Sequence, residues 1–373
     1  MIPLFKPHMD QQEIDAVAEV IRSGWIGLGP KTREFEEQFA RHIGVKHAIA
    51  LNSCTAALHL AVALYDFPLG SEVITSPITF VSTAFAPLYS GLTPVFADVQ
   101  EETLNIDPGD IRKKITSKTR AIIPVHYGGH PCDVKEIREI AAEHNLVIIE
   151  DAAHACGSAY WGKNIGAADN IACFSFAAIK NLSTGDGGMI TTNDDAFNER
   201  LRRLRWTGIS SSTFARASRD HYKWDYGVDE LGYKFHMTDI SAALGLVQLK
   251  KLERGNARRN EIFQRYNQDL ARISWLQTPI HKPGIRSSCH NYTMKVDADR
   301  EALIQHLGRQ GISAGVHYKP LYLHRVFQHI QASCPTADRL WPKLLTLPMY
   351  PAMSDADVQQ VIDAVSQFSP ARS

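Results

Sequence analysis

Short apolar runs alternate with amphipathic stretches from residue 48 to residue 192. The apolar runs predict buried strands, and the stretches between them place apolar residues at helical spacing. Strands and helices that alternate in this way predict a mostly parallel sheet with helices on both faces. The expected strands, in chain order, are AIAL at 48–51, EVITS at 72–76, TPVFADV at 93–99, AIIPVHY at 121–127 and LVIIED at 146–151.

Two helices are expected before the first strand. One covers residues 11–23 and ends at Gly24, and the other covers residues 31–43. A glycine after the last periodic residue is a common helix end signal, because it takes up a left-handed backbone without steric cost. The apolar face expected for the first helix consists of Ile14, Val17, Ala18 and Ile21.

The second half of the chain predicts a different organisation. A helix at 195–206 is followed by a polar loop at 207–229, and a long helical pattern then begins at Thr238 or Asp239. A loop of that length favours a functional or intersubunit role over a plain connection. We place a domain boundary inside or just after the long helix. The expected division is a large α/β domain at 1–250 and a smaller α+β domain at 251–373.

Composition narrows the class of protein. The chain has 373 residues with 40 basic and 40 acidic side chains, a balance that argues against nucleic acid or an anionic membrane as a partner. No apolar run approaches the roughly 18 residues of a membrane span, and the start MIPLFKPHMD lacks the pattern of a signal peptide. The cysteines form no C-x-x-C pair, so we expect no zinc site, no disulfide framework and a reducing, cytoplasmic setting. They are Cys54, Cys132, Cys156, Cys173, Cys289 and Cys334.

The stretch from Ile149 to Thr192 holds the strongest candidates for chemistry. Asp151 closes the apolar run LVIIE, and Lys180 follows a second apolar run, IACFSFAAI. The carboxyl ends of buried parallel strands are where α/β proteins bind ligands. We therefore expect the Asp151 carboxylate and the Lys180 amine to face each other across one pocket.

A third part of this pocket is expected at residues 52–56, NSCTA, where small residues open a helix directly after a strand. Free backbone N–H groups and the positive end of the helix dipole suit a phosphate, and Ser53 and Thr55 add hydroxyls. The alternative for this segment is an ordinary helix cap. Together, an anion site, a carboxylate and a lysine match pyridoxal 5′-phosphate, which needs a phosphate cradle, a partner for its pyridine nitrogen and an amine for a Schiff base.

Each candidate also has a structural alternative. Asp151 would keep the pyridine nitrogen protonated, or it would serve only as a cap or turn residue. Lys180 lies among apolar and small residues, whereas most lysines are solvated. His154 would contact the ring's phenolic oxygen, or it is a core histidine. Ser175 would donate to the phosphate or is a strand serine, and Phe80 would stack on the ring or belongs to the core.

Motifs along nearly the whole chain resemble those of one family. They are KPHMDQQEIDAVAEVIRSGWIGLGPKTREFEEQFA, NSCTAALHLA, SPITFVST, IEDAAHACGSAYWGK, FSFAAIKNLSTGDGGMITT, GYKFHMTDISAALGLVQLKKL, GVHYKP and LPMYPAMSDADVQQVI. In this order and spacing the chain resembles the sugar aminotransferases of the DegT/DnrJ/EryC1/StrS family, which are fold-type I pyridoxal-phosphate enzymes. The resemblance implies a large α/β domain with a mostly parallel seven-stranded sheet and a smaller C-terminal α+β domain.

The resemblance also implies roles for the residues of the pocket. Lys180 would form the Schiff base and act as acid and base, Asp151 would pair with the pyridine nitrogen, and His154 would contact the ring hydroxyl. Phe80 would cover one face of the ring. The phosphate would be held by Ser53, Cys54, Thr55, Ala56 and Ser175.

A homodimer is implied as well, with each active site completed by the other subunit through the GYKFHM stretch. The sequence departs here from a common family form, G-Y-N-Y-R-M. Lys234 stands in place of the phosphate-binding asparagine, and His236 stands in place of the arginine. We expect Lys234 to contact the phosphate of the other subunit.

The implied reaction moves an amino group from an amino acid, L-glutamate by resemblance, to a keto or aldehyde carbon of a sugar. The expected substrate is a nucleotide-linked sugar on the way to a surface polysaccharide, lipopolysaccharide or a secondary metabolite. The alternative is a free sugar acid, such as an oxidised 3-deoxy-octulosonate. Candidate substrate contacts come from the polar loop, the GYKFHM stretch and residues 317–319. They are Arg205, Trp206, Lys223, Trp224, Tyr226, His236, His317 and Lys319.

Other classes of protein fit less well. Family members that act as pyridoxamine-dependent sugar dehydratases carry a histidine in place of the Schiff-base lysine, so Lys180 argues against that activity. A regulatory protein that kept only the fold would usually lack Lys180 or Asp151, and both are present. A zinc hydrolase or a nicotinamide enzyme finds no support, because the chain has no H-E-x-x-H and no G-x-G-x-x-G after a strand. No metal is expected.

Overall fold

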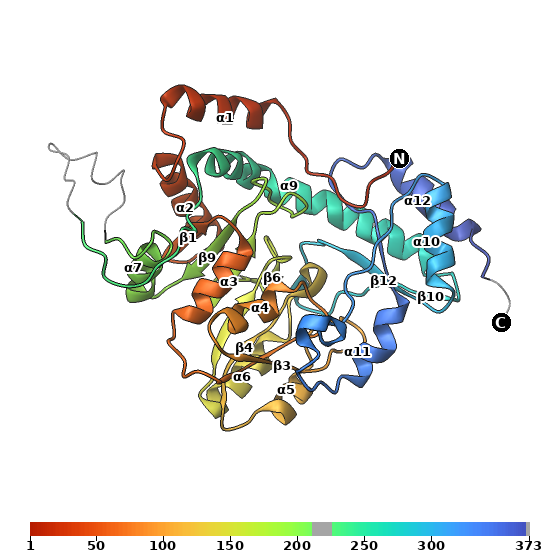
Figure 1. Ribbon diagram of the computed structural model, residues 1–373. Coiled ribbons are helices and arrows are strands. Elements are labelled where there is room, and N and C mark those ends of the chain that lie inside the picture. The colour runs from red at the N-terminus through yellow and green to blue at the C-terminus, as the bar shows by residue number, and fades with distance from the viewer. Residues whose placement is uncertain (211–225, 371–373) are drawn as a thin grey trace.

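The computed structural model describes residues 1–210 and 226–370, and a seven-stranded sheet lies at its centre (Figure 1). The strand order is β1-β9-β8-β5-β4-β2-β3. β9 runs antiparallel to β1 and β8, and every other pair of neighbours is parallel, which confirms the mostly parallel sheet. The strands are β1 (His47–Leu51), β2 (Glu72–Thr75), β3 (Thr93–Phe96), β4 (Thr119–Ile123), β5 (Val147–Asp151), β8 (Ile171–Ser175) and β9 (Gly188–Thr192).

Helices pack on both faces of the sheet, because alternate residues of a strand point to opposite sides. In β1, Ile49 and Leu51 join the apolar cluster of α3, whereas Ala48 and Ala50 join the cluster of α2 and α9. α3 is apolar on nearly every side and is almost completely buried. The helices of the large domain are α1 (Gln11–Ser23), α2 (Pro30–Ile43), α3 (Cys54–Ala63), α4 (Ser82–Tyr89), α5 (Pro108–Lys114), α6 (Val134–His144) and α7 (Asp195–Leu204), followed by the long α9 (Asp239–Leu270).

The register of the strands places the carboxyl ends of β1, β5 and β8 at the same end of the sheet. Leu51 pairs with Gly188, and Gly188 pairs with Ser175. Asp151 pairs with Cys173, two residues before the end of β8. The carboxyl ends of β5 and β8 therefore lie beside the segment that leaves β1 and enters α3.

The bounds of α1 agree with the prediction, but the face it buries does not. Glu13 and Val20 are buried, whereas Ile14 and Ile21 are 61% and 59% exposed. Glu13 is buried because its carboxylate accepts hydrogen bonds of 2.8 Å from the Lys251 ammonium on α9. Of the predicted apolar face, Ile14 and Ile21 are therefore exposed, whereas Val17 and Ala18 are half-buried.

The N-terminus of α2 is capped from a distance. The preceding residue, Gly29, has no side chain to cap it, and the buried Asp239 carboxylate accepts the backbone N–H groups of Gly29, Lys31 and Thr32 at 2.9 to 3.0 Å. A Cβ at Gly29 would lie 2.1 Å from the Trp25 ring, so only glycine fits there. Asp239 thereby ties the start of α9 to the start of α2.

α9 contributes side chains to two separate cores. Ala242, Leu246 and Leu252 belong to the cluster with the sheet and α2, whereas Phe263 and Tyr266 belong to a cluster in the C-terminal part. Figure 1 shows α9 passing below α1 and continuing toward α12. The predicted division near residue 250 falls inside this helix and stays a prediction.

The C-terminal part mixes helices with short strands. Its three-stranded sheet consists of β10 (Leu276–Gln277), β12 (Tyr292–Val296) and β13 (Leu344–Leu347), packed with α10 (Arg300–Arg309), α11 (Pro335–Leu340) and α12 (Asp355–Gln367). A second small sheet joins β6 (Ala159–Tyr160) and β7 (Lys163–Asn164) to β11 (Ile285–Arg286). Short 3-10 turns lie at Tyr127–Gly129, Leu321–Leu323, Arg325–Phe327 and Trp341–Lys343. None of the described helices is long and apolar enough to cross a membrane.

Candidate active site

The Asp151 carboxylate lies buried at the end of β5. Its Oδ2 accepts a 2.7 Å hydrogen bond from the Thr83 hydroxyl, and its Oδ1 accepts the backbone N–H of Ala153 at 3.1 Å. Burial raises the pKa of this carboxyl, and the two hydrogen bonds and the Lys180 ammonium oppose that rise. A buried carboxylate held in this way is suited to pair with a cationic nitrogen.

Lys180 lies half-buried in the turn after β8. Burial lowers the pKa of its amine to about 8, although nearby Cys54 and Asp151 act in the opposite direction. No described residue accepts a hydrogen bond from this amine. A lysine with a lowered pKa and no committed partner can act as a nucleophile near neutral pH.

The His154 ring is buried and held at both nitrogens. The backbone N–H of Gly128 points at Nδ1 from 3.3 Å, so Nδ1 is the acceptor and Nε2 carries the proton. The Tyr318 hydroxyl lies 3.3 Å from Nε2. Burial, followed by the charge of Lys180, lowers the pKa of His154 well below its usual value, and the ring is neutral. His154 therefore presents an N–H donor.

The segment that opens α3 caps the helix and leaves backbone donors free. Ser53 is the cap residue, and its hydroxyl accepts the N–H of Ala56 at 3.1 Å. Thr55 exchanges a 2.7 Å hydrogen bond with Ser82. The N–H groups of Cys54 and Thr55 have no acceptor among the described residues, as expected in a first helical turn. Two free donors at the positive end of a helix suit a phosphate.

Glycine at position 188 allows this segment to approach β9. A Cβ there would lie 2.4 Å from the carbonyl of Ser53 and 2.6 Å from the nitrogen of Cys54. Ser175, the pairing partner of Gly188, is buried at the end of β8. The structure thus brings together the predicted residues Asp151, His154, Lys180, Ser53, Cys54, Thr55, Ala56 and Ser175.

The residues proposed from the sequence as substrate contacts divide into separate groups. His317 lies near Lys180, whose charge adds to burial in lowering the pKa of His317 to about 4. Lys319 is exposed, and so is Phe80, whose side chain is 58% accessible in the single chain. Tyr226 is half exposed, and Lys223 and Trp224 lie outside the described residues.

A second cluster joins Trp206, Lys234 and His236. The Lys234 ammonium lies 3.4 Å from the centre of the Trp206 ring, and the His236 ring meets the same indole edge-on at 4.4 Å. Trp206 forms an isolated bridge with Lys234, and the segment that carries Lys234 and His236 runs beside the end of β1, where the N–H of Asn52 donates to the Phe235 carbonyl at 2.7 Å. These three side chains form one cationic and aromatic group.

Arg205 is not available to a substrate. It is buried, its guanidinium pairs with the buried Glu36 carboxylate, and it donates to the carbonyl of Ala50 at 2.8 Å. Arg202 pairs with the same carboxylate at 2.8 Å. The expected substrate contact at Arg205 was wrong, because the side chain ties α7 to α2 and β1.

Three contacts of the site were not predicted from the sequence. Thr83 contacts Asp151 from α4, and Tyr318 contacts His154 across 164 positions of the chain. His290 stacks on His154 with ring centres 4.4 Å apart. The segment FVST placed Thr83 close to Phe80, which was a weak signal for the first contact. Tyr318 belongs to the stretch 317–319 that was predicted to meet substrate, and no local pattern indicates His290.

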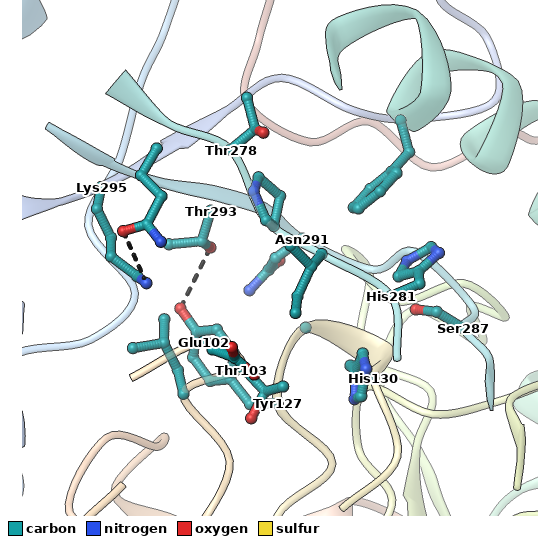
Figure 2. Close-up of a pocket in the computed structure, with 16 residues that line it drawn as sticks. Glu102, Thr103, Tyr127, His130, Thr278, His281, Ser287, Asn291, Thr293 and Lys295 are labelled. Carbon is teal, nitrogen blue, oxygen red and sulfur yellow. Dashed lines mark hydrogen bonds between the residues drawn. The ribbon is translucent and has the colours of Figure 1, made fainter. Parts of the chain in front are cut away.

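A separate small cavity lies behind the site, between the large domain and the C-terminal part (Figure 2). It has a volume of about 40 Å³ and touches Tyr127, Gly128 and Asn291. Both polar atoms of the Asn291 amide are buried without a partner among the described residues. Space of this size holds a few water molecules and no sugar. No group of three or more potential metal ligands occurs in the described part of the chain.

The donor set at this edge of the sheet fits pyridoxal 5′-phosphate. It offers a helix N-terminus with free N–H groups, a buried carboxylate, a neutral imidazole N–H and an amine with a lowered pKa. A model of the DegT/DnrJ/EryC1/StrS aminotransferase family matches residues 7–366. The chain belongs to this family.

Individual relatives agree over nearly their full length. The aminotransferase is 43% identical to the spore coat polysaccharide biosynthesis protein SpsC of Bacillus subtilis (strain 168), over 98% of this chain and 96% of SpsC. The sugar aminotransferase CalS13 from Micromonospora echinospora is 32% identical, with a TM-score of 0.91 over 99% of this chain and 100% of CalS13. Spr1654 from Streptococcus pneumoniae, solved in a PLP-form, is 32% identical with a TM-score of 0.90 over 98% of this chain and 97% of that chain.

These likenesses confirm the predicted family, fold, enzyme class and cofactor. The protein is a pyridoxal-phosphate-dependent aminotransferase of fold type I in a family of sugar aminotransferases.

Proposed function

We propose that this aminotransferase moves the amino group of L-glutamate to a keto or aldehyde carbon of a nucleotide-linked sugar. The observation that carries the proposal is the Lys180 amine, which has a pKa of about 8 and no hydrogen-bond partner among the described residues. It lies close enough to Asp151 for the carboxylate to oppose the fall of that pKa. Family membership supplies the sugar as the class of acceptor.

Lys180 has two tasks in this reaction. As a neutral amine it would hold the cofactor covalently, and once displaced by the amino substrate it would act as the base and acid that carries the proton leaving the substrate carbon. Pyridoxal 5′-phosphate supplies the electron sink that makes the substrate carbon acidic. The half-buried position of the amine supports both tasks, because desolvation keeps part of the population unprotonated at neutral pH.

Asp151 and His154 would hold the cofactor ring at two edges. The Asp151 carboxylate would accept a hydrogen bond from the protonated pyridine nitrogen and so stabilise its cationic form. The Nε2–H of His154 would donate to the ring oxygen, which the fixed acceptor role of its Nδ1 supports. Phe80, whose side chain is exposed in the single chain, would cover one face of the ring.

The phosphate would bind at the start of α3. Cys54 and Thr55 would donate their backbone N–H groups, Ser53 and Ala56 would shape the turn, and Ser175 would add a hydroxyl. The Ala56 N–H already donates to the Ser53 hydroxyl, so a phosphate would have to share this donor with Ser53. A dianionic phosphate is stabilised there by the helix dipole as well as by the donors.

We also propose a homodimer with shared active sites. The outward apolar face of α1, with Ile14 and Ile21 exposed, supports a partner surface. Leu231 is 87% exposed just before the GYKFHM stretch. Lys234 would reach the phosphate of the other subunit, with its ammonium held over the Trp206 ring until it does so.

The sugar nucleotide would meet both groups of candidate residues. The Trp206 ring and the side chains of His236 and Tyr226 offer stacking and hydrogen bonds, and His317 and Lys319 approach from the C-terminal part. SpsC is named for spore coat polysaccharide biosynthesis, which supports a role in surface polysaccharide or lipopolysaccharide. Such a reaction on activated sugars would belong in the cytoplasm.

The test is a pair of half-reactions. The purified enzyme should be yellow, and borohydride should link the cofactor covalently to Lys180. With L-glutamate the visible absorbance should change, whereas a Lys180→Ala variant should show no change. The aminated form is then offered keto-sugars with and without a nucleotide and a free keto-sugar acid. Turnover with only the free acid would overturn the nucleotide-linked assignment.

A further inference from the structure

His290 lies two residues before β12 and has no place in the reaction described above. Its ring is almost completely buried and stacks on the ring of His154, with centres 4.4 Å apart and planes inclined by 28°. The Phe5 ring also stacks on His290 at 5.7 Å, with the two rings nearly parallel at 6°. The Tyr318 ring stacks on His154 at 6.2 Å and 14°, so both histidines belong to a group of stacked rings from distant parts of the chain.

A hydrogen bond also fixes the edge of the His290 ring. Its Nδ1 lies 2.9 Å from Oδ1 of Asn181, the residue that follows Lys180. The Asn181 amide nitrogen donates to Oδ1 of Asn256 and to the carbonyl of Ser288, both at 2.7 Å. Since the nitrogen faces those two oxygens, Oδ1 faces His290, and Nδ1 of His290 is the donor.

The two partners of the Asn181 amide, Asn256 and Ser288, also bond to the backbone around His154. Asn256 donates to the carbonyl of Cys156 at 3.0 Å, and the Ser288 hydroxyl donates to the carbonyl of His154 at 2.6 Å. The His154 ring, the His290 ring and the Asn181 amide therefore belong to one closed set of contacts. Burial lowers the pKa of His290 well below its usual value, and its charged neighbours Lys180 and Arg259 act in the same direction, so the ring is neutral.

We propose that His290 is a positioning residue that clamps the His154 ring and ties it, through Asn181, to the segment carrying Lys180. This inference rests on the proposed contact between His154 and the ring oxygen of the cofactor. The clamp leaves His154 one orientation, with Nδ1 toward the Gly128 N–H and Nε2–H on the side of the Tyr318 hydroxyl, from where it would donate to the cofactor. A ring that turned freely would point its N–H at the cofactor for only part of the time.

The test reads the visible absorbance of the bound cofactor against pH. A donor at the ring oxygen weakens the hold of that oxygen on the Schiff-base proton, so loss of the donor raises the midpoint. His154→Phe should raise it by about one to two pH units, the scale of a hydrogen bond to a charged group. His290→Leu, which fills the space without a ring, should raise it in the same direction. His290→Phe restores the stack and should recover most of the shift.

Two further variants make the test specific. His281→Phe removes another stacked histidine, which packs on Phe263 at 4.1 Å and does not touch His154, and should leave the midpoint unchanged. Asn181→Ser keeps both rings and removes the acceptor of Nδ1 together with the two hydrogen bonds that the Asn181 amide donates. It should give a smaller shift even if His290→Leu does not fold. In the glutamate half-reaction, His290→Leu should lower kcat about tenfold or more and leave KM unchanged. Loss of a partner that orients a functional histidine has an effect of this size in metal sites.

The outcomes separate the two ideas. A shift with His154→Phe but none with His290→Leu or Asn181→Ser overturns the role of His290 alone. No shift with His154→Phe overturns the proposed contact of His154 and, with it, the clamp. An equal shift with His281→Phe shows a general loosening of the fold and also overturns the clamp.

Discussion

The Thr83 hydroxyl donates a 2.7 Å hydrogen bond to Oδ2 of Asp151, and both side chains are buried. This bond opposes the rise in the pKa of Asp151 that burial causes. Replacing Thr83 with valine removes the donor and keeps the shape, so the pKa of Asp151 should rise further. The acidic limb of kcat/KM for glutamate should then move to higher pH by about one unit.

Thr83→Ser is the matched control, because serine keeps the hydroxyl. Its pH profile should follow that of the unaltered enzyme. Profiles of the valine and serine variants that superimpose would show that the hydrogen bond does not tune Asp151.

Asp151→Asn tests the charge of the carboxylate with little change in shape. The amide oxygen can still accept from Thr83, so the fold and the cofactor should be retained. The glutamate half-reaction should slow by about 10² to 10⁴-fold, the range for a group that assists proton transfer. Single-turnover absorbance gives this rate. Asp186→Asn, an exposed carboxylate in the segment that follows Lys180, should keep the full rate.

Lys180 should show its lowered pKa in the cofactor-free protein. An amine is reactive when neutral, so labelling of Lys180 by an amine reagent should rise through a midpoint at about pH 8, well below the value of about 10.4 for a free lysine. Quantitative mass spectrometry of the labelled peptide gives the midpoint. In Asp151→Asn the midpoint should fall further, because the carboxylate raises this pKa.

The same shift predicts how stability depends on pH. Between about pH 8 and 10.4 the unfolded chain holds a proton on Lys180 that the folded chain has lost, so the contribution of Lys180 to the free energy of unfolding rises with pH in this window. Lys180→Met should remove that rise. A midpoint near 10 in the labelling experiment would contradict both expectations.

Mixing two inactive variants tests the shared active site. If Lys234 acts across the dimer, chains with Lys180→Ala and chains with Lys234→Ala should together form one intact site in each mixed dimer. Activity should return to about a quarter of the normal value, because half of randomly paired dimers are mixed and each has one of two sites intact. Sedimentation equilibrium should show the dimer. No recovery after confirmed mixing would place Lys234 in its own subunit's site or outside any site.

The sequence predicted those parts of the site that lie at the ends of local patterns. Asp151 ends an apolar strand and Lys180 follows another, so periodicity and strand order were enough to bring them together. The contacts of Thr83 with Asp151 and of Tyr318 and His290 with His154 form only through tertiary packing, and no spacing along the chain indicates these pairs.

Which side of α1 is buried could not be predicted for a related reason. Helical periodicity shows which residues share a face, and burial then depends on what that face meets. Here the Lys251 ammonium on α9 pairs with Glu13, so a charged residue is buried while Ile14 and Ile21 are exposed. A buried ion pair between residues 238 positions apart leaves no trace in either local pattern.

Because α9 carries side chains of both cores on one uninterrupted helix, the two parts of the chain have no flexible linker at which they could separate. Chains of two domains often unfold in separate steps. Here, unfolding of either core would remove the contacts of one half of α9, and the other core packs against the rest of the same helix. Denaturant should therefore unfold the chain in one transition seen alike by far-ultraviolet circular dichroism and tryptophan fluorescence, and limited proteolysis should release no stable fragment ending within α9.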